Sequence, residues 1–156
     1  MDKGLIRRIT SSDLDRIIEL ERKCFHENIA YTPNQLKYLI TKANSNCLTE
    51  TIEDILRGFI IVLYKKGTEV AGIETLNVDP IFQGRGIGKK LLKAAEEDMY
   101  DYGIKKIRLE VSLYNISAIN LYEKTGYRKK NILKNYYKNT QYGTYDAYRM
   151  IKELST

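Results

Sequence analysis

One short stretch constrains this chain more than any other: residues 75–92, which hold three glycines at alternate positions. The pattern predicts a strand, a glycine-rich turn and then the start of an amphipathic helix. The first backbone amides of a helix have no partner within it, so a helix that follows such a turn can bind an anion. Arg85, Lys89 and Lys90 add positive charge at the same place. The stretch therefore predicts a site for a phosphate or a diphosphate.

Two common phosphate-binding patterns do not fit the spacing of these glycines. A Walker A loop needs a glycine five positions before Gly88 and a Ser or Thr after its lysine, but Gln83 and Lys90 stand there. The dinucleotide fingerprint G-x-G-x-x-G needs its third glycine at position 89, which is Lys89. The pattern that remains is Gln83-x-x-Gly86-x-Gly88.

This remaining pattern, preceded by Val-Asp-Pro and followed by an amphipathic helix, resembles the acetyl-CoA diphosphate loop of the GNAT superfamily of N-acetyltransferases. The resemblance implies that acetyl-CoA is the cofactor, with CoA as a product. The competing interpretation is an ordinary glycine turn between a strand and a helix. The cofactor-binding residues implied by the resemblance are Leu76, Asn77, Val78, Gln83, Gly84, Arg85, Gly86, Ile87, Gly88, Lys89 and Asn115.

Composition limits the classes of protein to which the chain can belong. Its 156 residues, 43% hydrophobic and 29% charged, predict one globular domain over residues 1–156. No apolar run approaches the ~20 residues of a membrane helix, and the start of the chain lacks a signal-peptide pattern, so no membrane association is expected. Cys24 and Cys47 have no metal-binding or redox spacing, and His26 is the single histidine. We therefore expect no metal site and a cytoplasmic location.

The net charge of +6 favours polyanionic ligands, of which CoA is one. It leaves association with the ribosome open, but a lysine-rich surface would give the same charge, and no specific nucleic-acid recognition is predicted. The oligomeric state is also left open.

Apolar spacing and capping residues predict the order β-α-α-β-β-β-α-β-α-β-β. The first helix is expected to begin at Ser11-Ser12-Asp13, with Ser12 and Asp15 forming a capping box, and the second to begin at Thr32-Pro33 and to end at Asn44-Ser45-Asn46. Further helices follow the glycine loop and the cap Asn115 or Ser117. Strands are expected at residues 5–9, 47–52, 59–64, 69–78, 107–113, 127–137 and 145–152.

This order is similar to that of the GNAT fold. The fold class expected is therefore α/β (α+β), with helices on both faces of a mixed, mostly antiparallel sheet of about seven strands and four helices in all.

A second group of matches narrows the resemblance. Leu109-Glu110-Val111, Asn115, Ala118-Ile119, Leu121-Tyr122 and Gly126-Tyr127 resemble a signature of the RimI-type and Ard-type protein N-terminal acetyltransferases. Tyr136-Tyr137 and the later Asp-Ala-x-x-Met ending resemble their C-terminal pattern. There are three departures: Ser112 stands where these enzymes carry Arg, residues 138–145 make a longer loop than theirs, and His26 stands where the Pro-Glu-Asn segment of the Ard type has its proline.

The resemblance implies roles for three residues in acetyl transfer to an amine. Glu110 is expected to be the general base, with Glu27 as the second choice, and Tyr122 the general acid. A backbone N–H near Val78 is the expected oxyanion donor. Without the resemblance, Glu110 could be a solvated charge on a strand and Tyr122 a packing residue.

The resemblance also implies an acceptor site, formed by Phe25, Glu27, Ile29, Tyr136 and Tyr137. The acceptor expected is a protein or peptide N-terminus. Two alternatives remain: a small-amine acetyltransferase acting on a polyamine or aminoglycoside, and a non-catalytic CoA-binding or ribosome-associated module. The small-amine function ranks lower, because a polycationic acceptor needs several acidic groups around its site and the sequence offers mainly Glu27, Glu74 and Glu110.

Overall fold

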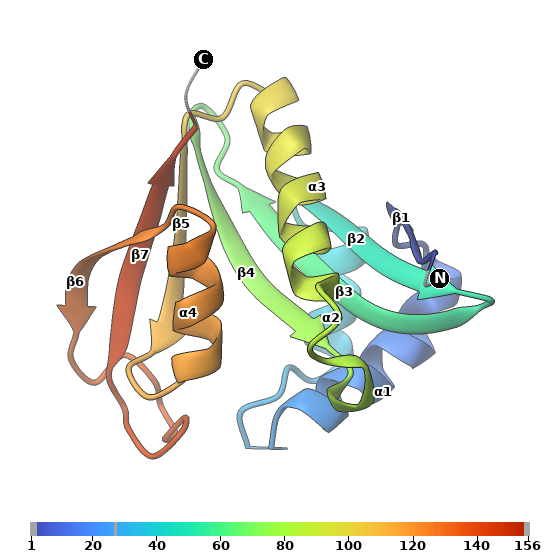
Figure 1. Cartoon of the computed structure of the whole chain (residues 1–156), viewed down its shortest axis with the longest axis horizontal. Coiled ribbons are helices and arrows are strands. Elements are labelled where there is room, and N and C mark those ends of the chain that lie inside the picture. The colour runs from blue at the N-terminus through green and yellow to red at the C-terminus, as the bar shows by residue number, and fades with distance from the viewer. Residues whose placement is uncertain (1–2, 27, 155–156) are drawn as a thin grey trace.

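The computed structural model describes residues 3–26 and 28–154. Four helices and seven strands follow the expected order (Figure 1). The helices are α1 Leu14–Cys24, α2 Pro33–Thr41, α3 Ile87–Asp101 and α4 Ile116–Lys124, with short 3-10 turns η1 Ser11–Asp13 and η2 Pro80–Phe82. The strands are β1 Leu5–Arg8, β2 Ser45–Ile52, β3 Ile55–Tyr64, β4 Val70–Val78, β5 Lys106–Ser112, β6 Arg128–Leu133 and β7 Ala147–Glu153.

All seven strands belong to one sheet, in the order β1-β2-β3-β4-β5-β7-β6. Only the β4–β5 pair is parallel, and every other pair is antiparallel. The expected mixed, mostly antiparallel sheet is therefore confirmed. Among the described residues, no helix has the length and apolar character needed to cross a membrane.

Two apolar clusters cover the two faces of this sheet, and β3 contributes to both. Ile60 and Val62 pack with α3 and α4 on one face. Phe59 and Ile61 pack with α1 and α2 on the other face. Alternate side chains of a strand point to opposite faces, so a strand that is apolar at every position must be covered twice. The continuous apolar run of β3 is explained by this central position.

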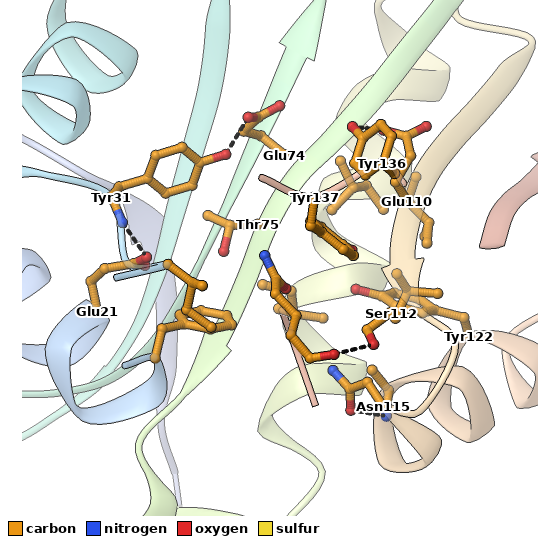
Figure 2. Close-up of a pocket in the computed structure, with 18 residues that line it drawn as sticks. Glu21, Tyr31, Glu74, Thr75, Glu110, Ser112, Asn115, Tyr122, Tyr136 and Tyr137 are labelled. Atoms are coloured by element: carbon orange, nitrogen blue, oxygen red, sulfur yellow. Dashed lines mark hydrogen bonds between the residues drawn. The ribbon is translucent and has the colours of Figure 1, made fainter. Parts of the chain in front are cut away.

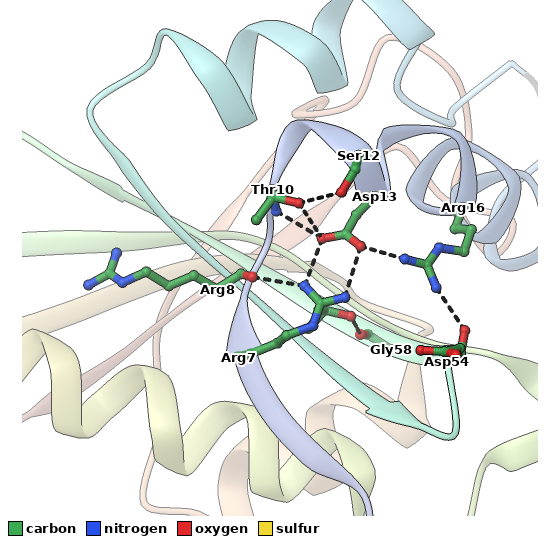
Figure 3. Close-up of polar contacts among 9 residues, drawn as sticks. Arg7, Arg8, Thr10, Ser12, Asp13, Arg16, Asp54 and Gly58 are labelled. Atoms are coloured by element: carbon green, nitrogen blue, oxygen red, sulfur yellow. Dashed lines mark hydrogen bonds and ion pairs between the residues drawn. The ribbon is translucent and has the colours of Figure 1, made fainter.

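The start of α1 differs from the predicted capping box of Ser12 and Asp15. The residue that organises this turn is Asp13, whose carboxylate accepts from the Thr10 N–H at 2.8 Å (Figure 3). Arg7 and Arg16 pair with the same carboxylate at 2.8 and 2.6 Å. Asp13 is almost completely buried, and these ion pairs join β1 to α1. The capping box is formed by Thr10 and Asp13, which have the same spacing as Ser12 and Asp15, and the ion pairs with Arg7 and Arg16 favour this register over the predicted one.

The start of α2 is as predicted, while its end is not. Thr32 caps the helix by accepting from the Gln35 N–H, and Pro33 occupies the first turn. The helix ends at Thr41, and the Ser45 and Asn46 predicted to end it already belong to β2.

The pairing of β4 with β5 is short, and the two strands then separate. Their register covers only Val70–Gly72 against Lys106–Arg108. Beyond it, β4 and β5 diverge towards their C-terminal ends (Figure 1). The β3–β4 register shifts between Ile61/Val62, so that Glu74 has no partner in β3, as in a β-bulge. The sheet therefore opens between β4 and β5, and side chains of both strands face the opening.

The strand predicted over residues 127–137 is too long. In the structure β6 ends at Leu133, and Asn135 has a positive φ of 53°. Tyr136 and Tyr137 therefore belong to the loop between β6 and β7 and not to a strand. Asn135, in the left-handed conformation, turns the chain out of the sheet. The aromatic residues that follow it favour a strand and give no sign of this turn.

Candidate active site

A groove of about 660 Å³ lies between the glycine loop, the end of β4 and α4. We call it the donor groove. It is lined by every residue that the sequence predicts for cofactor binding except Arg85. The Arg85 guanidinium instead lies 5.4 Å from the centre of the Phe82 ring.

The backbone of the glycine loop explains why glycines are needed there. Gly84 and Gly86 have φ values of 82° and 80°, a region that glycine adopts without strain. Gly86 is the N-cap of α3, so the first amides of this helix begin at the groove. Gln83 donates through Nε2 to the Val78 carbonyl at 3.2 Å and ties the loop to β4.

Gly88 allows a close approach between three elements. A Cβ at this position would lie 3.4 Å from Leu121 of α4 and 3.6 Å from Val78 of β4. Together with Lys89, the helix terminus offers backbone donors and positive charge to an anion. This set of donors fits a diphosphate, and the adjoining groove is also lined by Leu76, Asn77 and Val78 of β4.

A second cavity, of about 200 Å³, lies where β4 and β5 separate (Figure 2). We call it the acceptor cavity. It is lined by Phe25, Ile29, Glu110, Tyr122, Tyr136 and Tyr137, all predicted from the sequence as catalytic or substrate-binding residues. Glu27 lies outside the described residues.

The donor groove and the acceptor cavity share five lining residues, which are Phe25, Leu76, Asn115, Ala118 and Tyr122. Asn115 caps α4 by accepting from the Ala118 N–H at 3.2 Å, so the cap also positions the helix against both cavities. The two spaces therefore meet at the start of α4.

Tyr122 stands at this meeting point. Its ring is buried and makes an edge contact with Tyr127, with 5.5 Å between the ring centres. No described residue bonds to its hydroxyl, which points into the cavity region in Figure 2. Burial raises the pKa of Tyr122 above its ordinary value, so the phenol keeps its proton at neutral pH.

Glu110 enters the acceptor cavity from β5 and is held by three neighbours. Arg149, directly opposite on β7, donates to Oε2 at 3.0 Å, and Arg108 donates to the same oxygen at 3.1 Å. Tyr136 donates to Oε1 at 3.3 Å. Both guanidinium groups bind one oxygen, which leaves Oε1 as the more available proton acceptor.

Two carboxylates that sequence reasoning left out of the site also line the acceptor cavity. Glu74, the unpaired bulge residue of β4, accepts from the Tyr31 hydroxyl (Figure 2). Glu21 of α1 is fully buried, where it accepts from Asn77 Nδ2 at 2.7 Å and from the Tyr31 N–H at 2.9 Å. Burial raises the pKa of Glu21. The side chain of Asn77 is therefore occupied within the fold, although the residue lines the donor groove.

Glu74 is one of the acidic residues that the sequence offers for an amine site, but its position in the cavity depends on a bulge that the alternation of β4 does not reveal. Glu21 lies on an ordinary amphipathic helix and carries no sequence signal. Three carboxyl groups therefore line the acceptor cavity, and that of Glu110 is ion-paired with Arg149 and Arg108.

Comparisons with known proteins agree with this geometry. The model of the acetyltransferase (GNAT) family matches residues 14–127. The chain is 30% identical to an N-alpha-acetyltransferase of Saccharolobus solfataricus, over 98% of this chain and 96% of that protein. It is 34% identical to the [ribosomal protein bS18]-alanine N-acetyltransferase of Salmonella typhimurium, over 67% of this chain and 69% of that one.

The fold is similar to that of a solved structure as well. The crystal structure of the ribosomal-protein-S18-alanine N-acetyltransferase from Escherichia coli superposes with a TM-score of 0.87 at 25% identity. The match covers 99% of this chain and 96% of that chain.

Proposed function

Because the chain belongs to the GNAT family of acetyltransferases, we propose that it transfers the acetyl group of acetyl-CoA to the α-amino group of protein N-termini. The observation that carries the proposal is the meeting of two cavities at Tyr122. One has the glycine loop for the diphosphate, and the other has carboxylates for an amine. The names of two relatives that match over nearly the whole length of both chains support the choice of acceptor.

The glycine loop would hold acetyl-CoA through the backbone amides at the start of α3, with Lys89 beside them. Bound there, acetyl-CoA supplies a thioester carbonyl that an amine can attack. A backbone N–H at the end of β4, near Val78, is proposed to stabilise the negative charge that develops on the carbonyl oxygen.

Two side chains are proposed to move protons. Glu110 accepts, through a water molecule, the proton that the amine loses as the new C–N bond forms. Tyr122, whose phenol is protonated beforehand, donates its proton to the sulfur as the C–S bond breaks. Transfer is direct, so no covalent link between the acetyl group and the protein is needed.

The chemistry of the base favours an α-amine over a lysine side chain. An α-amino group has a pKa near ~8, whereas a lysine amine has one near ~10.4. A carboxylate acting through water therefore removes a proton from an N-terminus far more easily. Glu27 remains the second choice for the base, and Glu74 is a third candidate because it lines the same cavity.

The cytoplasm is the proposed location, supported by the two free thiols Cys24 and Cys47, which suit a reducing compartment. Ribosomal proteins are a proposed class of acceptor, supported by the names of two relatives and by the net charge of +6, which favours contact with RNA.

The test is to mix the protein with acetyl-CoA and a panel of peptides that differ in their first residue, and to measure release of free CoA thiol. We expect release above background with at least one peptide. Spermidine and an aminoglycoside serve as competing acceptors, because the carboxylates of the acceptor cavity would also attract a polyamine. Faster turnover of spermidine than of every peptide would favour small-amine acetylation over N-terminal acetylation. No turnover of any amine would reject both functions.

A further inference from the structure

The long segment at residues 138–145, which we call the strap, crosses from β5 to α1. It belongs to the loop between β6 and β7, at the lower edge of the molecule in Figure 1. In the middle of the strap, the Gln141 carbonyl accepts from the Ser112 hydroxyl of β5 at 2.8 Å. Near its start, Asn139 donates through Nδ2 to the Asn28 carbonyl, in the connection between α1 and α2, at 3.0 Å. The strap is thus anchored on both sides of the opening in the sheet.

Ser112 and the long strap are two of the three departures from the resembled pattern, and the structure connects them. Ser112 is 2% exposed, and its hydroxyl bonds to the strap itself. These two departures are therefore in direct contact.

The tip of the strap is a tight turn. Gln141 and Thr144 are bridged by two backbone hydrogen bonds, of 2.9 and 3.3 Å. Between them, Tyr142 and Gly143 have φ values of 56° and 85°, the combination that a type I′ turn requires. A tyrosine rarely adopts such a φ, and backbone strain of this kind is often found at functional positions.

The Tyr142 side chain does not line the acceptor cavity, although its neighbour Gln141 does. It lines the donor groove instead, where Cys24 and Phe25 also lie. Phe25 belongs to both cavities, so Tyr142 stands near the end of the groove where they meet and on the side of the groove formed by α1. The Tyr142 side chain is 52% exposed, which leaves surface that a ligand in the groove could cover.

We propose that Tyr142 binds the acetyl donor, with its ring packing on the pantetheine arm of acetyl-CoA. The residue lies on the strap, which also contributes Gln141 to the acceptor cavity. The inference rests on the proposed use of acetyl-CoA. Because Ser112 and Asn139 hold the strap, donor binding and the position of the acceptor wall are coupled. Bound acetyl-CoA stabilises the strap in the position seen here, and the strap in this position retains acetyl-CoA.

The test compares two ligands by calorimetry. Acetyl-CoA has the pantetheine arm, whereas adenosine 3′,5′-bisphosphate has only the nucleotide end. We expect Tyr142→Ala to weaken acetyl-CoA binding roughly five- to tenfold, which corresponds to losing the contact of part of one aromatic ring. Binding of the bisphosphate should not change. An unchanged Kd for acetyl-CoA, or an equal loss for both ligands, would overturn the inference.

The matched control is Tyr145→Ala. Tyr145 lies on the same strap and is similarly exposed, at 48%, but lines neither cavity. This variant should bind both ligands as the unchanged protein does. Ser112→Ala removes the hydrogen bond from β5 to the strap but keeps the Tyr142 side chain. It should also weaken acetyl-CoA binding, though by less than Tyr142→Ala does. If Ser112→Ala had no effect while Tyr142→Ala did, the coupling would be wrong and the contact would stand.

Failure of the proposed function gives a different result. If no amine is acetylated but Tyr142→Ala still weakens acetyl-CoA selectively, then the acetyltransferase function fails and the donor contact stands. If peptides are acetylated and Tyr142→Ala changes nothing, the function stands and the contact fails. If the unchanged protein does not bind acetyl-CoA, both are rejected.

Discussion

Tyr122 differs from the other tyrosines of the acceptor cavity in its surroundings. Tyr31 and Tyr136 donate their hydroxyl protons to Glu74 and Glu110, so those protons are already shared with carboxylates. The hydroxyls of Tyr122 and Tyr137 have no such partner among the described residues, but of the four tyrosines that line the acceptor cavity only Tyr122 also lines the donor groove. This combination suits a residue that gives a proton to a leaving thiolate.

Replacing Tyr122 by Phe should lower kcat by about a hundredfold, because only the proton donor is lost. The Kd for acetyl-CoA should stay within about twofold, since the ring still lines the groove. Steady-state kinetics and calorimetry measure the two quantities. The control is Tyr127→Phe, which keeps the neighbouring ring and removes a hydrogen bond to Glu96. A comparable loss of kcat in that control would mean that the Tyr122 effect is structural.

Replacing Glu110 by Gln tests the proposed base against Glu74. Both carboxylates line the acceptor cavity, but only Glu110 is fixed by Arg149 and Arg108. Glu110→Gln should lower kcat roughly a hundredfold, with acetyl-CoA binding retained. Glu74→Gln should change kcat by less than about fivefold. The reverse result, measured from CoA release with one peptide, would transfer the role of base to Glu74.

At the scale of elements, the glycine loop and the helix after it could be predicted from local sequence alone. The positions that need a positive φ carry glycine, and the helix after the loop shows a clear apolar period. In contrast, the sequence does not reveal the bulge at Glu74 or the left-handed Asn135, because each depends on pairing with another strand or on the path of a loop. Local rules place elements well, and they fail where a distant partner decides the backbone.

The glycine at the start of α3 can be tested with a matched pair. Gly86 and Gly67 both have φ near 80°, and a Cβ at either would meet no neighbour within 4 Å. Changing either to Ala should lower the free energy of unfolding by ~1 kcal/mol through backbone strain alone. Only Gly86→Ala should also weaken acetyl-CoA binding, because Gly67 lies in a hairpin away from the groove. Equal binding by the two variants would show that the loop does not hold the donor.

The ion pairs of Asp13 should make stability depend on pH. The guanidinium of Arg7 holds the pKa of Asp13 well below its ordinary value. A carboxyl group with a lowered pKa in the folded state stabilises the fold above the unfolded value, near ~4, and this contribution is lost as the pH falls further. Asp13→Asn should therefore cost about 2–3 kcal/mol at pH 7 and progressively less at lower pH.

Urea unfolding between neutral pH and about pH 3 measures this dependence. The control is Asp15→Asn, an exposed carboxylate two residues along the chain, which should unfold like the unchanged protein. An Asp13→Asn variant whose deficit stays constant with pH would contradict the role of the ion pairs.

At the scale of the whole molecule, the site depends on the separation of β4 from β5. Their pairing stops at Gly72 and Arg108, and the acceptor cavity lies beyond that point. The carboxyl ends of two parallel strands meet at one edge of the sheet, so residues far apart in sequence, such as Leu76 and Glu110, line one cavity. The resemblance supplies this expectation for Glu110 and Tyr122. The longer loop at residues 138–145 and the acidic Glu74 could also be named from the sequence, whereas Glu21 and the contacts that hold the loop follow only from the three-dimensional arrangement.

The central claim is that a free N-terminus, entering the acceptor cavity, receives the acetyl group next to Tyr122. The most direct test uses a peptide that carries both a free α-amino group and one lysine, together with the same peptide blocked at its N-terminus. Tandem mass spectrometry after incubation with acetyl-CoA locates the product. We predict acetylation of the α-amino group alone and no reaction of the blocked peptide. Acetylation of the lysine at an equal or greater rate, or acetylation of neither amine, would contradict the account.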